Sequence, residues 1–146
     1  LAGTLAAPAQ KEAVEDPAWT RTLRAIAGSV RANVPRHARV GAIDKWDPTL
    51  LSLARRRGPH FPDRALLPGG YPATSREAID HLEALRARGM EYLVVPCSAF
   101  WWPEHYVEWS RHLERRYTRR FADERCVIWE LNDTTPDSAI LERGPA

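Results

Sequence analysis

Side chains that could do chemistry gather at two points where a predicted strand ends. The first is the polar stretch at residues 44–47, and the second is the stretch at residues 97–102. Carboxylates and a lysine can hydrogen-bond hydroxyl groups, while an indole can stack on the face of a sugar. Ligands of open parallel sheets bind beyond the carboxyl ends of the strands, so both stretches would share one rim if their strands are neighbours. The predicted ligand-binding residues are Asp44, Lys45, Asp47, His60, Ser98, Trp101 and Trp102.

A catalytic alternative centres on His60. This histidine could act as a general base, with Asp44 or Asp47 orienting its ring, in a small transferase or hydrolase. The alternative requires His60 to lie within hydrogen-bond or one-water reach of one of these carboxylates. Cys97 is a weaker candidate for a nucleophile: a strand-to-helix turn can lower a thiol pKa, but Cys97 lacks the flanking glycines of a nucleophile elbow. An inert, half-buried thiol is the favoured interpretation.

The sequence contains little that indicates a metal site or a nucleotide site. His105, Glu108 and His112 share one flank of a predicted helix, but their histidines are two turns apart, about 10 Å, whereas metal-binding helices space histidines by four residues. Neither a Walker loop nor a Gly-x-Gly-x-x-Gly pattern occurs, and the loop after the first predicted strand has no glycine. We therefore predict no metal and no cofactor such as NAD or ATP.

Three consecutive aromatic residues, Phe100, Trp101 and Trp102, follow the second of these strands. Aromatic rings bury large areas, so one or two of them should pack under the helix that follows. Three neighbours cannot all point inward from one turn, so at least one ring should face the rim.

Composition narrows the classes of partner. A chain of 146 residues with 44% hydrophobic and 27% charged residues is sized for one globular domain and is not disordered. The formal net charge of +2 argues against nucleic acid as the main partner, and the basic runs at residues 55–57 and 115–120 are interpreted as solvated helix ends. No apolar run reaches the ~20 residues of a membrane span. The two cysteines match neither a disulfide framework nor a metal site, which favours a reducing, cytoplasmic location.

Local signals place the elements around these residues. Helix starts are predicted at Asp16-Pro17, at Asp47-Pro48, and at a capping box of Thr74 and Glu77. Strands are predicted at residues 39–44, 91–96 and 126–131, with a short one at His60 and Phe61. A further amphipathic helix carries Tyr106, Trp109, Leu113 and Tyr117, and Gly89 should end the helix before residues 91–96 in a left-handed conformation.

This order of elements predicts an α/β fold, a single compact three-layer sandwich with a small, mainly parallel sheet resembling half of a Rossmann fold. A C-terminal hairpin could pair residues 117–121 with residues 126–131. The domain should span residues 16–133, between a flexible segment at residues 1–15, whose first ten residues could be a signal-peptide remnant, and a loose tail at residues 134–146. If the strands before Cys97 and after Cys126 are parallel neighbours, the two thiols lie at opposite edges of the sheet and stay reduced, with Cys126 the more buried.

The motifs "HFP" at residues 60–62, "HLEALRARG" at 81–89, "WW" at 101–102 and "HLERRY" at 112–117 carry a resemblance. Residues 39–131 resemble an uncharacterised α/β domain of bacterial, often actinobacterial, proteins, found beside glycosyltransferase or methyltransferase domains of surface-polysaccharide pathways. The resemblance implies a Ser-Lys-Gly-Asp-like turn where this chain has residues 44–47, with Trp46 in place of the glycine, and a small residue where Cys97 stands. It implies no reaction and no catalytic residues.

Three hypotheses about function follow. The leading one is a non-catalytic accessory domain of a bacterial glycan-assembly protein, which binds a sugar-containing ligand or docks a fused or partner glycan enzyme. The second is the small transferase or hydrolase centred on His60. The third is a structural spacer, which a flat rim and fully buried aromatic rings would favour.

Overall fold

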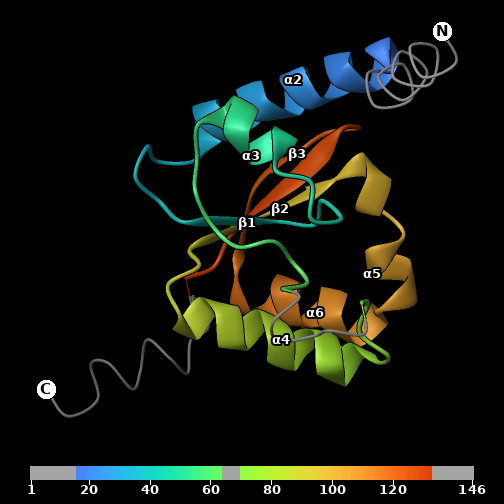
Figure 1. The fold of residues 1–146 in the computed structure, drawn as a ribbon. Helices are drawn as coiled ribbons and strands as arrows, with labels where there is room; N and C mark the ends of the chain where they lie inside the picture. The colour runs from blue at the N-terminus through green and yellow to red at the C-terminus, as the bar shows by residue number, and fades with distance from the viewer. Residues whose placement is uncertain (1–15, 64–69, 133–146) are drawn as a thin grey trace, which may run out of the picture.

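The computed structural model describes residues 16–63 and 70–132, which form a four-stranded mixed sheet with helices on both faces (Figure 1). The strands are β1 (Val40–Ala42), β2 (Tyr92–Pro96), β3 (Thr118–Ala122) and β4 (Cys126–Glu130), and their order in the sheet is β1-β2-β4-β3. β2 is buried along its whole length, as its apolar sequence predicted for a central strand covered on both faces.

The prediction of a mainly parallel sheet is wrong. β1 and β2 are parallel, but β4 runs antiparallel to both of its neighbours, β2 and β3. The physical reason lies in the predicted C-terminal hairpin, which is confirmed. The chain that crosses over from β2 leads to β3 at the far edge, and the tight turn after β3 folds β4 back into the space between β3 and β2. The crossover therefore ends on β3, and β4 is not a parallel neighbour of β2.

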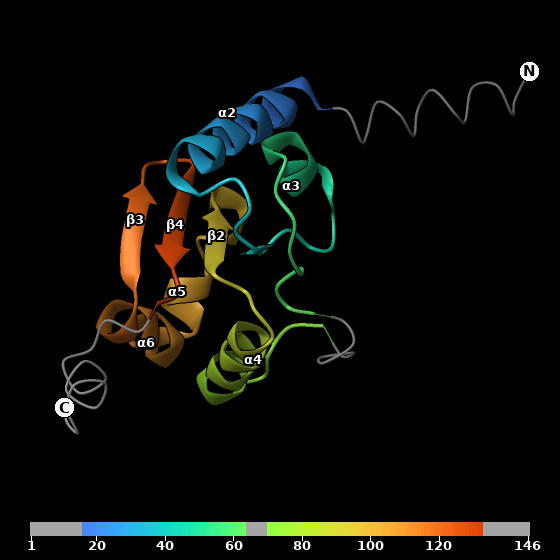
Figure 2. The same ribbon diagram turned by 90° about the vertical axis from the view of Figure 1, so that its left-hand side faces the viewer.

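The helices form two layers, one on each face of the sheet (Figure 2). One layer contains α2 (Pro17–Asn33) and α3 (Thr49–Ala54), and the other contains α4 (Ser75–Ala87), α5 (Trp102–His105) and α6 (Val107–Arg116). Each layer closes its own apolar core against the sheet. The core of the first includes Leu23, Ile26, Val30, Leu50, Val94 and Ile128, and that of the second includes Phe61, Leu82, Leu93, Trp102, Trp109 and Leu113.

The helix boundaries follow the predicted local chemistry. The Asp16 side chain accepts a hydrogen bond from the Ala18 amide at 3.0 Å, and Thr74 Oγ1 accepts one from the Glu77 amide at 3.1 Å. Gly89 has a φ of +111°, the left-handed conformation expected after α4. These helix starts and this helix end are confirmed.

Antiparallel pairing also corrects the geometry of the thiols. Cys126 lies opposite Pro96 in the ladder, so it and Cys97 occur at the same edge of the sheet rather than at opposite edges. Both cysteines are free thiols, and Cys126 is buried while Cys97 is half-buried, which confirms the predicted order of burial.

The remaining expectations concern the chain ends and the membrane. The predicted segments at residues 1–15 and 134–146 lie outside the described residues. None of the helices in the described ranges combines the length and apolar character that a bilayer span requires.

Candidate functional site

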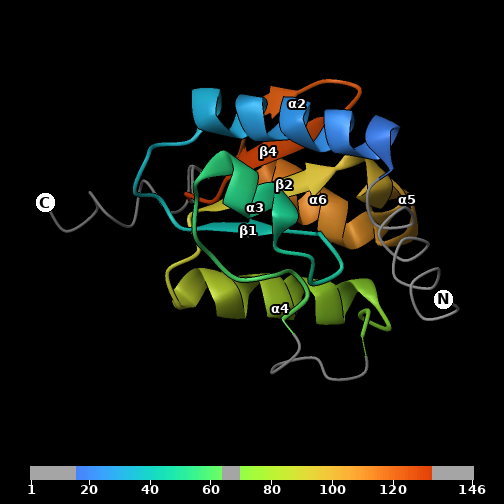
Figure 3. The same cartoon turned by 45° about the horizontal axis from the view of Figure 1, so that its top comes forward.

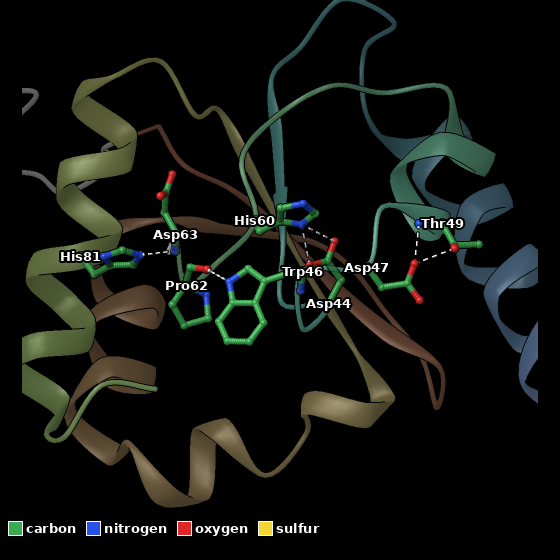
Figure 4. Close-up of polar contacts among 8 residues, drawn as sticks. All are labelled: Asp44, Trp46, Asp47, Thr49, His60, Pro62, Asp63 and His81. Atoms are coloured by element: carbon green, nitrogen blue, oxygen red, sulfur yellow. Dashed lines mark hydrogen bonds and ion pairs between the residues drawn. The ribbon is translucent and has the colours of Figure 1, made fainter. Parts of the chain in front are cut away.

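Asp44 and His60 form the central polar contact at the carboxyl end of β1 (Figure 4). His60 Nδ1 lies 2.8 Å from Asp44 Oδ1 and 3.0 Å from Oδ2. The Asp44 side chain is 5% exposed, whereas that of His60 is 35% exposed. An ionised carboxylate only accepts hydrogen bonds, so His60 donates from Nδ1 and its Nε2 is the ring atom available as an acceptor.

The chain brings His60 to Asp44 because residues 57–60 run parallel to β1 along its outer edge. Parallel bridges link Arg39 with Arg57 and Ala42 with His60, and the Phe61 amide donates to the Ala42 carbonyl at 2.9 Å. The short strand predicted at His60 and Phe61 is therefore present as an isolated bridge. Because Ala42 is the last residue of β1, its bridge partner His60 lies beside the loop that follows this strand.

The loop at residues 44–47 is held in an unusual backbone conformation. Lys45 and Trp46 have φ values of 54° and 65°, in the left-handed region that non-glycine residues rarely adopt. Two hydrogen bonds hold Trp46: its amide donates to Asp44 Oδ1 at 3.1 Å, and its indole Nε1 donates to the Pro62 carbonyl at 2.8 Å (Figure 4). Trp46 thus fastens this loop to the segment that carries His60.

Burial and hydrogen bonding shift the pKa of Asp44 in opposite directions. Burial raises the pKa of its carboxyl group above the ordinary value, and the hydrogen bonds from His60 and the Trp46 amide oppose this only in part. A buried carboxylate in this position orients the imidazole ring and fixes its tautomer. His60 Nε2 is thus the ring nitrogen placed to act as an acceptor.

A pocket of about 390 Å³ lies where α2 and α3 meet the carboxyl ends of β1 and β2. Four of the sequence-predicted residues line it: Asp44, Lys45, Asp47 and Ser98. Its apolar wall consists of Trp19, Leu23, Leu50 and Pro96. His60 does not line this pocket but contacts its wall through Asp44.

The two predicted tryptophans do not join this pocket. Trp102 is fully buried, with its ring 4.7 Å from that of Tyr106 and 5.2 Å from that of Trp109, so its placement at the rim is wrong. The helix after the turn packs over Trp102, which satisfies the expectation that at least one of the three rings packs inward. Trp101 is 40% exposed, but its ring stands edge-on to that of Tyr71 rather than beside Lys45.

Sequence reasoning missed Trp19, which supplies the aromatic surface of the pocket. Trp19 is half-buried and packs against the core of the first layer. The sequence signal is its position: Trp19 lies in the first turn of α2, directly after the helix start at Asp16-Pro17 and ahead of the buried residues that begin at Leu23. Large aromatic residues in the first turn of a covering helix can reach the rim of the sheet.

Other polar clusters serve the scaffold. His81 is buried and accepts a hydrogen bond from the Asp63 amide at 2.7 Å, and burial lowers its pKa (Figure 4). His112 donates to Glu83 at 2.8 Å, as expected of a hydrogen-bonded histidine. No group of three metal-ligating side chains occurs in residues 16–63 and 70–132.

A wider hollow of about 920 Å³ lies at the opposite edge of the sheet, by the start of β2 and the end of β4. Its polar lining includes Arg36, His37, Glu91 and Glu130, and it contains none of the sequence-predicted site residues. We therefore place the candidate site at the smaller pocket, where polar groups from separate loops converge. Comparison of the chain with protein-family models, with curated proteins and with solved structures finds no match to any of them.

Proposed function

We propose that the chain is a binding domain that holds a small sugar-containing ligand in the pocket between α2, α3 and the carboxyl ends of β1 and β2. The observation that carries this proposal is the lining of that pocket. This lining combines the apolar side chains of Trp19, Leu23 and Leu50 with two carboxylates, a lysine and a serine hydroxyl. Its volume of about 390 Å³ lies within the range of small-ligand sites.

The chemical groups of a sugar match this combination of apolar and polar side chains. Pyranose rings carry C–H groups on their faces, which stack on an indole, and hydroxyl groups around their edges. Asp44 and Asp47 can accept hydrogen bonds from these hydroxyls, and Lys45 can donate one. A flat rim with fully buried aromatic rings would favour the spacer hypothesis, but the chain has a pocket at the rim and a half-exposed Trp19.

The test is a titration of the chain with monosaccharides, nucleotide sugars and glycan fragments, followed by tryptophan emission and by calorimetry. We expect the W19F variant to lose the emission change, whereas W101F, which changes an exposed tryptophan away from the pocket, keeps it. S98A should weaken binding in calorimetry, and S52A, at an exposed position on α3 outside the pocket, should not. If no ligand produces heat or an emission change at millimolar concentration, the proposal fails and docking of a partner enzyme takes its place.

A second candidate function is acid–base catalysis by His60, favoured by its contact with Asp44. One reaction of this class is ester hydrolysis. His60 Nε2 takes a proton from water as the water oxygen attacks the acyl carbon. The bond to the leaving oxygen then breaks, and His60 returns the proton to that oxygen.

This candidate is tested with p-nitrophenyl acetate as the ester. We expect hydrolysis above the uncatalysed rate that falls by about a hundredfold or more in H60Q. D44N should retain the base but orient it less well, and H105Q, which changes an exposed histidine on α5, is the matched control. Equal rates for the wild type and H60Q would exclude a catalytic role for His60 while leaving the binding proposal intact.

A further inference from the structure

The arginines of the chain divide into two populations. Residues 16–59 contain eight arginines and one lysine, but the only carboxylate side chains in this stretch are Asp16, Asp44 and Asp47. α2 and α3 themselves contain no acidic residue. The net charge of +2 for the whole chain therefore hides a strong local excess of positive charge in the first layer of helices.

Ion pairing separates the same two populations. None of the eight arginines in residues 16–59 pairs with a carboxylate of the described residues, although Arg31 and Arg56 donate to the carbonyl groups of Leu53 and Val34. In the second half of the chain, by contrast, many described arginines form ion pairs with carboxylates, among them Arg76, Arg86, Arg111, Arg119, Arg120 and Arg125. Within the described ranges, the arginine side chains of this first stretch thus have no carboxylate partner.

Seven of these arginines are exposed: Arg39 directly precedes β1, and the other six lie on α2 or within three residues of the end of α2 or α3. α2 and α3 lie side by side over the same face of the sheet (Figure 3). We define the basic face as the exposed residues Arg21, Arg24, Arg31, Arg36, Arg55 and Arg57. α2 alone, at 17 residues, extends this face over about 25 Å.

We propose that the basic face binds the phosphate groups of an anionic lipid surface. Guanidinium groups pair with phosphate oxygens through two parallel hydrogen bonds, and each basic side chain near an anionic bilayer strengthens binding about fivefold. The large exposed apolar side chains among the described residues, Tyr71, Trp101 and Val107, all lie outside α2 and α3. Binding should therefore be electrostatic, without insertion into the hydrocarbon, and should weaken with salt.

A lipid surface fits these observations better than nucleic acid. Besides its arginines, the exposed positions of α2 are Pro17, Ala18 and Ala32, which offer no ring to stack on bases. The amide side chain of α2, Asn33, is half-buried and donates to the Ser29 carbonyl, so it is not free to read base edges. α2 also lies flat beside α3, rather than projecting alone as a helix that enters a groove does. The proposal goes beyond the proposed sugar-binding function and does not depend on it.

The experiment measures co-sedimentation of the full chain with vesicles of phosphatidylglycerol and phosphatidylcholine, with vesicles of phosphatidylcholine alone, and with a DNA duplex in a parallel gel-shift assay. One variant replaces Arg21, Arg24, Arg55 and Arg57 with Gln, and its matched control replaces Arg76, Arg111, Arg119 and Arg125 with Gln. Both variants lose the same charge, and circular dichroism checks that each is folded.

We expect binding to the phosphatidylglycerol vesicles that falls by roughly two to three orders of magnitude in the first variant and stays close to wild type in the second. Binding should also disappear in high salt. Equal losses in the two variants would overturn the proposal, because they would reflect net charge alone. Equal binding to uncharged vesicles, binding to DNA but not to vesicles, or binding to neither would each overturn it as well.

Discussion

The indole Nε1 of Trp46 donates a hydrogen bond to the carbonyl oxygen of Pro62 at 2.8 Å, joining the loop after β1 to the segment that carries His60. The Asp44–His60 pair joins the same two segments. Trp46 also holds a left-handed backbone conformation, which costs a non-glycine residue about 1–2 kcal/mol. Its side-chain contact therefore offsets a local cost and fixes the geometry of the candidate site.

The W46F variant tests this role. Phenylalanine keeps a ring but removes the donor, so the free energy of unfolding in urea should fall by about 1–2 kcal/mol. The imidazole NMR signals of His60 should shift or broaden, because its segment loses an anchor. W101F should change neither quantity, since the Trp101 ring is exposed. Unchanged His60 signals in W46F would show that the Asp44 contact alone holds the histidine.

Gly58 provides a second test, because the chain passes very close to β1 at this residue. A Cβ atom at Gly58 would lie 1.7 Å from the Val40 carbonyl oxygen, so the backbone must move to accept alanine. We expect G58A to lose about 1–3 kcal/mol of stability and to displace His60 from Asp44.

The matched control for G58A is G28A, in α2, where the nearest atom to the new Cβ is Arg31 Nη2 at 3.8 Å. Alanine removes the flexibility of glycine inside a helix, so G28A should gain about 0.5–1 kcal/mol. Thermal unfolding of both variants measures the difference. A neutral G58A would mean that residues 57–60 do not pack on β1 as described.

The hydrogen bonds of Glu83 should make the stability of the fold depend on pH. It accepts hydrogen bonds from Tyr117 Oη, His112 Nε2 and Arg86 Nε. Burial by itself would raise the Glu83 pKa, but these donors outweigh burial, so the pKa lies below its ordinary value. A lowered folded-state pKa gives stability that is present above the unfolded-state pKa and is lost as the pH falls through the folded-state pKa.

E83Q should therefore be less stable than wild type by about 2 kcal/mol at pH 7, and the difference should narrow below about pH 4. Urea unfolding across the pH range measures it. E114Q is the control, because Glu114 is exposed and its pair with Arg119 should contribute less than about 1 kcal/mol. A difference for E83Q that is constant with pH would show that the Glu83 charge does not stabilise the fold.

The thiols should react at very different rates. Burial raises the pKa of Cys126 to about 12, so almost no thiolate forms at pH 8, and the side chain packs in the core under α2. We expect one fast-reacting thiol with Ellman's reagent in the native chain and two after denaturation without reductant. C97S should abolish the fast reaction. Fewer than two thiols in the denatured, unreduced chain would reveal a disulfide.

Local chemistry predicted the elements well but not their assembly. Asp16, Thr74 and Gly89 mark helix ends through short-range hydrogen bonds and backbone preferences, which sequence alone reveals. The order of the strands depends instead on where the hairpin of β3 and β4 packs, and no residue near Cys126 encodes whether β4 or β3 lies beside β2.

The candidate site shows the same limit. Asp44, Lys45, Asp47 and Ser98 were predicted from their positions at strand ends, and they do converge on one pocket. Trp102 was misplaced because its sequence neighbours cannot show which of three adjacent rings points inward. The Trp19 side chain was missed because its part in the pocket depends on how far α2 extends beyond the sheet.

The two outer strands of the sheet, β1 and β3, determine where another molecule could add a strand. Residues 57–60 run along the outer side of β1 and pair with it at two positions, so a strand from another molecule cannot dock there without displacing them. The outer side of β3 has no such cover among the described strands, but its pairing with β4 is irregular between Arg119 and Phe121, and Arg119 and Arg120 are exposed along it. An irregular border lined by charged side chains is a poor template for growth of intermolecular β-structure. Removal of both arginine charges should therefore turn β3 into the place where fibrils begin.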